Sequence, residues 1–419
     1  MAEERWEHLP GDILYDVALR LRNLRDLFSY AAVCKSWHSA LAPVIKSPPP
    51  LPPGFPMLML LRQDQEGGGC GRQRRFFSLL DGRTHRMKVN EVVNGTGMSS
   101  CVGVSHGWLV VTDREVEVHL THPLTEHAVK LPPLSRCPNS TYGELLPEDF
   151  CDFFITKAVV TAAPWKDGAA NPDCVVLALV GQADFLWACR LGDEISDHSN
   201  AAWTELELIV EGYADVVCHK GNIYAASGFG AVYTINNITT GVRNLAELKW
   251  RKLCSGSKLN ESRVANYLVS SLSGDLLLVK RYRAGFYYNK AADEGELFDL
   301  ESMYLTVGFM VSKLVDCGRR RRPCKLERVY NLRSDEALFV GQSCSLSLSL
   351  EAMNTNKQQE GRGMLTPNCI YFTDDQSDFF SEVLGGHDQG VFNMADDTVK
   401  PCYTRKIAPS LFCQPLWYM

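Results

Sequence analysis

Val217–Ala225 reads VCHKGNIYA, and Gly230–Ile235, which reads GAVYTI, follows four residues later. An apolar run leads into a polar turn that contains Gly221, and a second apolar run leads away from it. Short runs of this kind, bounded by Gly, Asn and Asp, are typical of β-strands joined by tight turns. The pattern predicts a β-hairpin here, and similar runs fill most of the chain from Met57 onward.

The same strand, turn and strand recur elsewhere in the chain. Val104–Val110 (VSHGWLV) and Leu268–Val279 (LVSSLSGDLLLV) repeat the shape. The repeats lie roughly fifty residues apart, or a multiple of that, which matches the length of a kelch-like blade. Evenly spaced strands fit either stacked sandwiches or a β-propeller, and the repeat favours the propeller. The length of this region predicts about six or seven blades, in a chain that is mainly β with a small α module.

The α module is predicted at the N-terminus. Pro10 suits the start of a helix, and Asp12 suits the positive end of the helix dipole. Apolar residues then follow at gaps of one, three and four, at Ile13, Leu14, Val17 and Leu21. This spacing predicts a helix over 12–21 with one apolar face.

A second helix is expected behind a cap at Asn23 or Asp26, with apolar residues at helical spacing: Leu27, Tyr30, Ala31 and Cys34. Pro43 is expected to end helix formation. Three short helices in about thirty-five residues bury little surface, and domains of that size usually need metals, disulfides or partners. The module is therefore expected to depend on a partner.

Three motifs in this module resemble an F-box by their order and spacing: Leu9–Leu14 (LPGDIL), Asp26–Phe28 (DLF) and Val33–Trp37 (VCKSW). An F-box docks on a Skp-type adaptor of a ubiquitin ligase, and through it on a cullin scaffold. The resemblance implies these adaptor-binding residues: Leu9, Pro10, Ile13, Leu14, Val17, Leu21, Leu27, Val33, Cys34 and Trp37. The alternative is that these residues are only the core of a small helical cap on the following domain. That alternative is the better explanation for any one of them alone, whereas the F-box is the better explanation for the ordered set.

Two places depart from the F-box pattern. Family members commonly carry a bulky apolar residue where this chain has Ala18, and a more basic run where it has Ala31 and Ala32. We expect these departures to weaken adaptor binding. Each buried aliphatic side chain contributes roughly 1.5–3 kcal/mol before the cost of association, so one truncated position does not abolish an interface built from several.

The α module is assigned to residues 1–46, and a proline-rich linker at 47–56 (SPPPLPPGFP) separates it from the β-propeller at 57–419. So many prolines favour an extended, semi-rigid spacer that holds the two at a fixed distance. A plain linker is the equal alternative. Met57–Leu61 (MLMLL) is expected to begin the first strand of the propeller.

The β region resembles the plant F-box proteins with a KIB-type β-propeller. The resemblance rests on His106–Trp108 (HGW), the HPLT turn that leads to Leu131–Pro133 (LPP), the VVCHKGNIYA strand pair, and the late order SGDLLLV, FMVSKL, LFVG and CIYFTDD. It runs from Leu9 to about Trp417. It implies a substrate-recognition subunit of a Skp–cullin–F-box ligase, and it names no substrate.

Composition narrows the function classes. A net charge of −6 and a pI near 6.0 argue against general nucleic-acid binding, which needs a basic domain. The start MAEERWEHLP does not read as a signal peptide, and no apolar run approaches the length of a membrane helix. We expect a soluble intracellular protein without a membrane partner, in the cytoplasm, the nucleus or both. Its dispersed fifteen cysteines are then expected to be buried small hydrophobes and occasional free thiols.

Motifs for catalysis or cofactor binding are missing: the sequence holds no P-loop, no H-E-x-x-H and no G-x-S-x-G elbow. His119 and His122 stand three apart at a strand end, where alternation does not aim both at one metal. We therefore expect no catalytic residue, no cofactor and no metal.

Five segments are assigned to turns, loops or insertions. Asp374-Asp375 and Asp396-Asp397 are interpreted as turn residues, with contact to a basic peptide as the alternative. Arg319–Arg322 is interpreted as a solvated hairpin loop, with a nuclear import signal or a contact to an acidic partner as the alternatives. Residues 284–300 and 351–363 are expected to be insertions, the second one disordered.

Two hypotheses follow from the sequence. In the first, the F-box binds a Skp-type adaptor while the propeller selects an unidentified protein for ubiquitination and itself catalyses nothing. In the second, the F-box is vestigial and the propeller acts alone as a binding protein or an enzyme. Loops that carry propeller specificity leave no signature in one sequence, so the substrate stays open.

Overall fold

The computed structural model describes residues 9–21, 29–31, 33–46, 56–60, 73–79, 82–88, 99–105, 107–113, 117–122, 127–134, 155–181, 185–191, 203–209, 211–236, 238, 244–257, 264–287, 302–315, 323–351, 365–375, 388–402 and 416–418. Leu27, Ala32, most of the linker at 47–56, the basic run Arg319–Arg322 and nearly all of 351–363 lie outside these residues.

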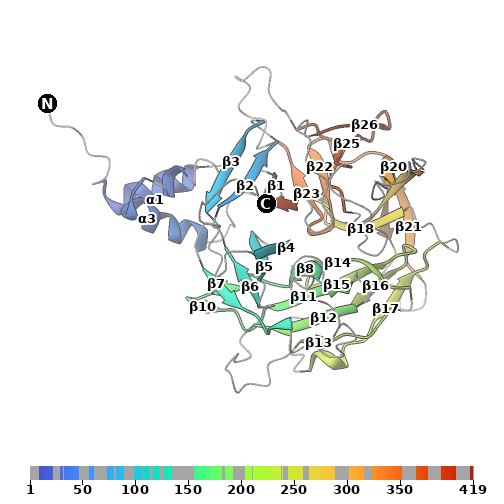
Figure 1. Cartoon of the computed structure of the whole chain (residues 1–419), viewed down its shortest axis with the longest axis horizontal. Coiled ribbons are helices and arrows are strands. Elements are labelled where there is room, and N and C mark those ends of the chain that lie inside the picture. The colour runs from blue at the N-terminus through green and yellow to red at the C-terminus, as the bar shows by residue number, and fades with distance from the viewer. Residues whose placement is uncertain are drawn as a thin grey trace, which may run out of the picture.

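Six sheets stand in a ring and form a six-bladed β-propeller (Figure 1). Blade 1 consists of β27 (Leu416–Tyr418), β1 (Met57–Leu60), β2 (Gln73–Ser78) and β3 (Thr84–Lys88). Blade 2 consists of β4 (Ser99–Ser105), β5 (Trp108–Asp113), β6 (Val118–Thr121) and β7 (Ala128–Lys130). Blade 3 consists of β8 (Ile155–Val160), β11 (Val175–Val180), β12 (Phe185–Arg190) and β13 (Thr204–Glu205).

The other three blades complete the ring. Blade 4 consists of β14 (Tyr213–His219), β15 (Asn222–Ser227), β16 (Val232–Ile235) and β17 (Arg251–Cys254). Blade 5 consists of β18 (Val264–Ser270), β19 (Leu276–Tyr287), β20 (Ser302–Val315) and β21 (Lys325–Val329). Blade 6 holds β22 (Glu336–Val340), β23 (Leu346–Ser349), β24 (Cys369–Phe372), β25 (Gly390–Asn393) and β26 (Thr398–Lys400). A two-stranded ribbon, β9 (Trp165–Lys166) with β10 (Ala169–Ala170), follows β8, and the 3-10 helix η4 (Leu245–Glu247) precedes β17.

The ring is closed by the two ends of the β region. Met57–Met59 of β1 pair antiparallel with Leu416–Tyr418 of β27, so the last strand of the chain completes the first blade. This pairing holds the ring together, because it joins segments at opposite ends of the sequence within one sheet. The predicted first strand at Met57 is confirmed, and six blades is one of the two numbers predicted.

The three repeated sequence segments occupy equivalent places. Each forms the first hairpin of its blade: β4 with β5, β14 with β15, and β18 with β19. Gly107, Gly221 and Gly274 each sit in the turn of that hairpin at positive φ, which glycine adopts without the penalty of a Cβ atom. The repeat that predicted a propeller is therefore a repeat of blade hairpins.

Blade 6 departs from the regular meander. β22 pairs in parallel with β24, whereas β23 lies on the other side of β22 and contacts β18 of blade 5. A second departure is the length of β19, which continues to Tyr287 and pairs with β20 from Ser302. The predicted insertion at 284–300 is therefore wrong for residues 284–287, because they belong to a long strand.

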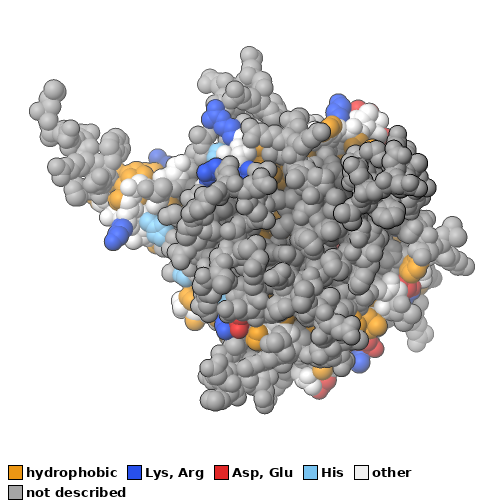
Figure 2. Space-filling model, in the orientation of Figure 1, with side chains coloured by type: hydrophobic (Ala, Val, Ile, Leu, Met, Phe, Trp, Pro, Cys, Tyr) orange, Lys and Arg blue, Asp and Glu red, His pale blue; other side chains and the backbone are white. Residues whose placement is uncertain are grey.

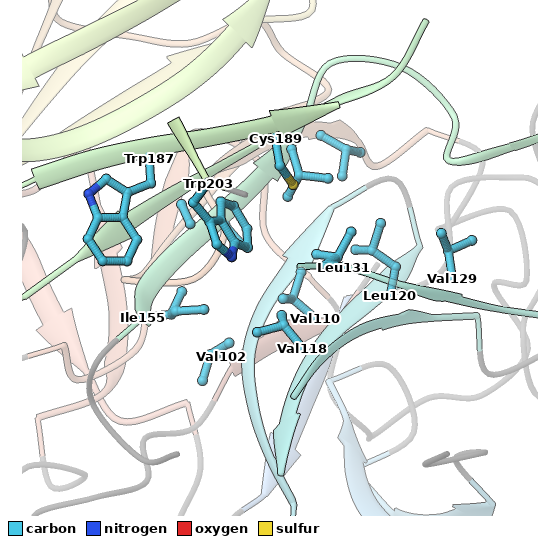
Figure 3. Packing of buried hydrophobic residues seen from close by; sticks show 14 of the residues in the cluster. Val102, Val110, Val118, Leu120, Val129, Leu131, Ile155, Trp187, Cys189 and Trp203 are labelled. Carbon is cyan, nitrogen blue, oxygen red and sulfur yellow. The ribbon is translucent and has the colours of Figure 1, made fainter. Parts of the chain in front are cut away.

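Hydrophobic contact between neighbouring blades forms most of the core. One cluster joins blades 2 and 3 through side chains that include Val110, Leu120, Val176 and Trp187 (Figure 3). Trp203 closes this cluster, and its Nε1 donates to Pro132 O at 2.8 Å. Near the axis, a Cβ on Gly103 would lie 3.1 Å from Ala158 N, so glycine permits the close approach of β4 and β8.

The N-terminal module contains α1 (Gly11–Arg20) and α3 (Lys35–Lys46), and residues 29–31 between them are also helical. Helix α1 agrees with the predicted helix over 12–21. The prediction that Pro43 ends helix formation is wrong, since α3 continues to Lys46. A proline costs one main-chain hydrogen bond within a helix, and here that loss does not stop the helix.

The module shares a hydrophobic cluster with the propeller. Leu14, Ala18, Tyr30 and Leu41 of the helices are buried in the same cluster as Met57, Met59, Phe76, Val104, Leu109, Val111 and Leu416 of blades 1 and 2. Figure 1 shows α1 and α3 beside the edge of β2 and β3. The module is thus joined to the propeller by packing as well as by the chain that connects them.

Nine cysteines among the described residues are free thiols, five of them half-buried and four buried. Cys324 is disulfide-bonded, so the expectation of free thiols is wrong for this position. Within the described part of the chain, no helix is long and apolar enough to cross a membrane.

Candidate functional site

Helix α1 directs most of its apolar residues at the shared cluster. Leu14 and Ala18 are each 1% exposed within it, and Val17 and Leu21 are half-buried against it. The predicted apolar face is therefore confirmed for Leu14, Val17 and Leu21. Ile13 is the exception, because it is 46% exposed.

The structure places the predicted adaptor-binding residues in three environments. Pro10, Ile13 and Val33 are exposed; Leu9, Val17, Leu21, Cys34 and Trp37 are half-buried; and Leu14 is buried. Tyr30, which the sequence placed on the second helix but not among the adaptor-binding residues, contacts both Leu14 and Trp37. Its hydroxyl donates to Leu14 O at 2.7 Å, and its ring lies 4.7 Å from that of Trp37. Figure 2 shows hydrophobic side chains on the surface of this module.

Ala18 and Ala31, at which the chain departs from the F-box pattern, are less exposed than Ile13 and Val33. Ala18 is buried in the shared cluster, so its small size affects internal packing and removes no exposed contact area. Ala31 is half-buried against the same cluster. The exposed apolar area at Ile13 and Val33 does not depend on either residue.

A buried polar network joins blades 5 and 6, and Arg281 of β19 is its centre. The Arg281 Nε donates to Thr306 Oγ1 at 2.7 Å, and Nη2 donates to the carboxylate and the main-chain oxygen of Asp388 at 2.9 and 2.8 Å. Nη1 donates to Thr373 O at 2.7 Å and to Asp375 Oδ1 at 3.1 Å. This side chain is 0% exposed, and its donors are satisfied, as a buried charge requires.

Further side chains complete this network. Arg283 donates to Asp375 at 2.7 Å, and the hydroxyl of Tyr304 donates to Asp374. Asp374 also accepts the main-chain N–H of Asp388 at 3.1 Å. The interpretation of Asp374-Asp375 as turn residues is therefore wrong: they follow a strand, but their carboxylates are buried partners of arginine and tyrosine. Asp396-Asp397 do lie in the turn between β25 and β26, as predicted.

Charge compensation decides the ionisation of this network. Burial alone would raise the pKa of Asp375, but the guanidinium groups of Arg283 and Arg281 hold it below its usual value. Burial and the Asp374 carboxylate raise the pKa of Tyr304, which keeps its hydroxyl protonated as a donor. The network is thus charged, internally paired and structural in character.

Polar contacts at the ends of the inner strands join other blades. His219 Nδ1 lies 2.8 Å from Ser270 Oγ, which links blade 4 to blade 5. The buried carboxylate of Glu336 accepts the main-chain N–H of Leu272 at 2.9 Å, which links blade 5 to blade 6. These residues were not found from the sequence, because partners 51 or 64 residues apart leave no local pattern.

The two histidines considered for metal binding lie in different surroundings. His119 lies in β6, whereas His122 is 8% exposed just after the strand and lies edge-on to Trp108 at 5.4 Å. Burial, with a smaller effect from His127, lowers the pKa of His122 to about 4. No group of three or more potential metal-ligating side chains occurs in the part of the chain that the structure describes.

Comparison with known proteins matches both parts of the chain. The family model for the KIB1-4 beta-propeller matches residues 76–393, and an F-box-like model matches residues 6–43. The chain belongs to the KIB1-4 β-propeller family. The combination of an F-box-like module with a KIB1-4 propeller indicates an F-box substrate-recognition protein.

The relatives of this KIB1-4 propeller protein are F-box proteins of Arabidopsis thaliana. F-box protein At2g26160 is 25% identical over 56% of this chain, and the match spans 65% of its own length, slightly under two thirds. Probable F-box protein At1g65740 is 23% identical over 88% of this chain and 90% of its own. F-box protein At4g35733 is 23% identical over 96% of this chain and 98% of its own. The match to At4g35733 covers nearly the whole of both chains and so includes both the module and the propeller.

Proposed function

We propose that this protein is the substrate-recognition subunit of a Skp–cullin–F-box E3 ubiquitin ligase. The F-box-like module docks on a Skp-type adaptor and through it on a cullin scaffold, and the propeller binds the protein to be ubiquitinated. The subunit itself catalyses nothing, because ubiquitin transfer belongs to other components. The cytoplasm, the nucleus or both are its proposed place of action.

The observation that carries this proposal is apolar surface on a module that has already built its core. Ile13 is 46% exposed and Val33 is 48% exposed, while Leu14 and Ala18 of the same module are buried. Exposed apolar side chains on a module whose core is already formed support a docking role, because a partner that covers them removes them from water. A helical partner that covers Ile13, Val33 and Pro10 would remove this surface from water.

A pull-down with purified Skp-type adaptor tests the docking. We expect the wild type to bind and Ile13→Asp to lose binding, since a charge in an apolar interface is desolvated without a partner. Leu19→Asp is the matched control. Leu19 is 53% exposed on the same helix, but six residues from Ile13 place it roughly 120° away around the axis.

Two results would contradict the proposal. If the wild type fails to bind any Skp-type adaptor, the F-box is vestigial and the propeller acts alone. If Ile13→Asp binds as well as the wild type, the exposed apolar surface is not the docking site. Equal melting temperatures for the two variants show that both are folded.

Proximity labelling under proteasome inhibition addresses the substrate. We expect proteins labelled by the full chain to accumulate under proteasome inhibition, and to become longer-lived when Ile13→Asp removes adaptor binding. A set of neighbours whose lifetimes do not respond to Ile13→Asp would mean that recognition by the propeller does not lead to degradation.

A further inference from the structure

The outer strands of five blades have features that prevent a further strand from pairing with them. β7, β13 and β26 are only three, two and three residues long. β3 contains Arg86, and β17 begins with Arg251 and Lys252. Short edge strands and charged side chains are two ways in which proteins keep an exposed sheet edge from adding another chain. The outer edge of blade 5 differs from these.

In blade 5, β20 is longer than the strand that covers its edge. Residues 302–313 pair with β19 on one side, whereas β21 pairs only with residues 311–315 on the other. Among the described strands, residues 302–310 therefore have a partner on one side alone, and β26 of blade 6 approaches β20 without pairing with it. Gly308 has only main-chain atoms and is half-buried, so part of the main chain reaches solvent there.

The uncovered stretch of β20 carries no charge. It reads SMYLTVGFM, in which Leu305 is 49% exposed and Val307 is 57% exposed. Val307 is a bulge residue, because Thr306 and Gly308 pair with consecutive residues of β19 while Val307 has no partner there. The bulge leaves residues 302–306 as a regular free edge, which is about the length of an ordinary strand. Neither a charged side chain nor a proline blunts this edge.

The opposite face of this stretch is fixed to blade 6. The hydroxyl of Tyr304 donates to Asp374, and Thr306 Oγ1 donates to Asp388 at 2.8 Å while it accepts Arg281 Nε at 2.7 Å. Leu305 lies between these two residues and points away from blade 6, because side chains of a strand alternate between faces. A strand that is already held in its paired conformation loses little entropy when another strand joins it.

Other exposed apolar side chains lie on the same part of the blade. Of the ten large apolar side chains that are exposed among the described residues, four belong to β20, to β21 or to the residue after β21. Besides Leu305 and Val307 these are Leu326, which is 37% exposed, and Tyr330, which is 68% exposed. This concentration supports an interaction site at the outer strands of blade 5.

We propose that the free edge of β20 binds an extended apolar segment of the target protein as an added strand. The main chain of the segment pairs with residues 302–306, and its apolar side chains at alternate positions lie beside Leu305 and Val307. A single segment fits better than a second copy of this chain, because β21 bounds the free edge at Val311 and a whole propeller would have to fit beside it. The inference deepens the proposed recognition role of the propeller and rests on it.

Selection from a randomised peptide display library, with the purified full chain as bait, tests the proposal. We expect enriched peptides with apolar residues at alternate positions and no proline between them. The most enriched peptide is then N-methylated at one residue at a time and measured by fluorescence anisotropy. Methylation should weaken binding roughly tenfold at every second residue and less at the residues between, since alternate N–H groups of an added strand face the sheet.

Variants of β20 locate the binding site. Leu305→Lys and Val307→Lys should each weaken binding of the enriched peptide roughly tenfold or more, since a lysine on an edge strand opposes further pairing. Leu208→Lys is the matched control, because Leu208 is a leucine of similar exposure, 52%, that follows β13 of blade 3. Melting temperatures close to that of the wild type show that the variants are folded.

Hydrogen exchange resolved to single amides tests whether the edge is open in the free chain. We expect about half of the amides of residues 302–306 to exchange rapidly in the free chain and to become protected when the peptide binds. Protection of all these amides in the free chain would show that another part of the chain covers the edge, and would overturn the inference.

Three further outcomes would overturn it. These are peptide binding that is equal in the wild type and Leu305→Lys, an N-methyl scan without alternation, and Leu305-dependent dimerisation of the chain in place of peptide binding. Adaptor pull-down on the same samples separates this inference from the proposed function, because Leu305→Lys should bind the adaptor as the wild type does. Lost adaptor binding with intact peptide binding contradicts the ligase role alone, and the reverse contradicts the strand-binding edge alone.

Discussion

Lys157 and Asp215 form a buried ion pair between the inner strands of blades 3 and 4, with Nζ 2.5 Å from Oδ1. The same carboxylate accepts the main-chain N–H of Leu268 in blade 5 at 2.7 Å. One side chain thus joins three consecutive blades near the axis of the ring. Burial raises the pKa of Asp215, and the charge of Lys157 opposes that effect.

Breaking this pair should destabilise the propeller strongly. We expect Lys157→Met to lower the free energy of unfolding by about 3–5 kcal/mol, because it leaves the Asp215 carboxylate buried without its cation. Urea denaturation measures the change, and the double variant Lys157→Met/Asp215→Asn should cost less than the sum of the single variants. Lys252→Gln, at a partly exposed ion pair, is the control and should cost at most about 1 kcal/mol. Additive single costs would show that the two charges are not coupled.

Replacing Arg281 should weaken the contact between blades 5 and 6 and so destabilise the propeller. Arg281→Met leaves the carboxylates of Asp375 and Asp388 buried, and we expect a loss of about 3–5 kcal/mol of unfolding free energy. Arg281→Lys should recover little, since an ammonium group cannot reproduce the planar set of five donors. Arg328→Met is the control, because Arg328 is exposed and lies over the Tyr330 ring at 5.1 Å. A lysine variant as stable as the wild type would contradict the requirement for a guanidinium.

Stability should fall as the pH is lowered from about 6.5 to about 4, in part through His122. Burial lowers the pKa of His122 to about 4, so the unfolded chain binds a proton in this range while the folded chain does not. The contribution is about 3 kcal/mol, fully present above pH 6.5. Urea denaturation across this range should show a smaller decrease for His122→Gln than for the wild type. Parallel curves for the two proteins would mean that His122 is protonated in the folded state.

Enlarging Ala18 should disturb the shared cluster and not the adaptor surface. Because Ala18 is 1% exposed between the helices and the propeller, we expect Ala18→Leu to cost about 1–3 kcal/mol of stability through overpacking. Leu19→Ala, at an exposed position of the same helix, is the control and should be nearly neutral. Adaptor binding of folded Ala18→Leu should equal that of the wild type. Stronger binding with unchanged stability would show that residue 18 faces the adaptor.

Local pattern determined much of the architecture. Alternating apolar runs and glycine turns, as in Val217–Ala225, predict strands because side chains of a strand alternate between two faces. The repeat of that unit predicted a propeller, and the spacing of Ile13 and Leu14 placed the first helix within a residue of its bounds. The order of LPGDIL and VCKSW pointed to the F-box before any fold was known.

Tertiary structure alone decided which residues meet. Arg281 and Asp388 stand 107 residues apart, and Lys157 and Asp215 stand 58 apart, so no local spacing reports that they pair. The same holds for the close approach of Gly230 to Asn266 and Lys280, which arises only because two blades pack together. Ring closure through β1 and β27 brings distant segments side by side, and the chemistry of a buried charge then depends on its neighbours in space and not in sequence.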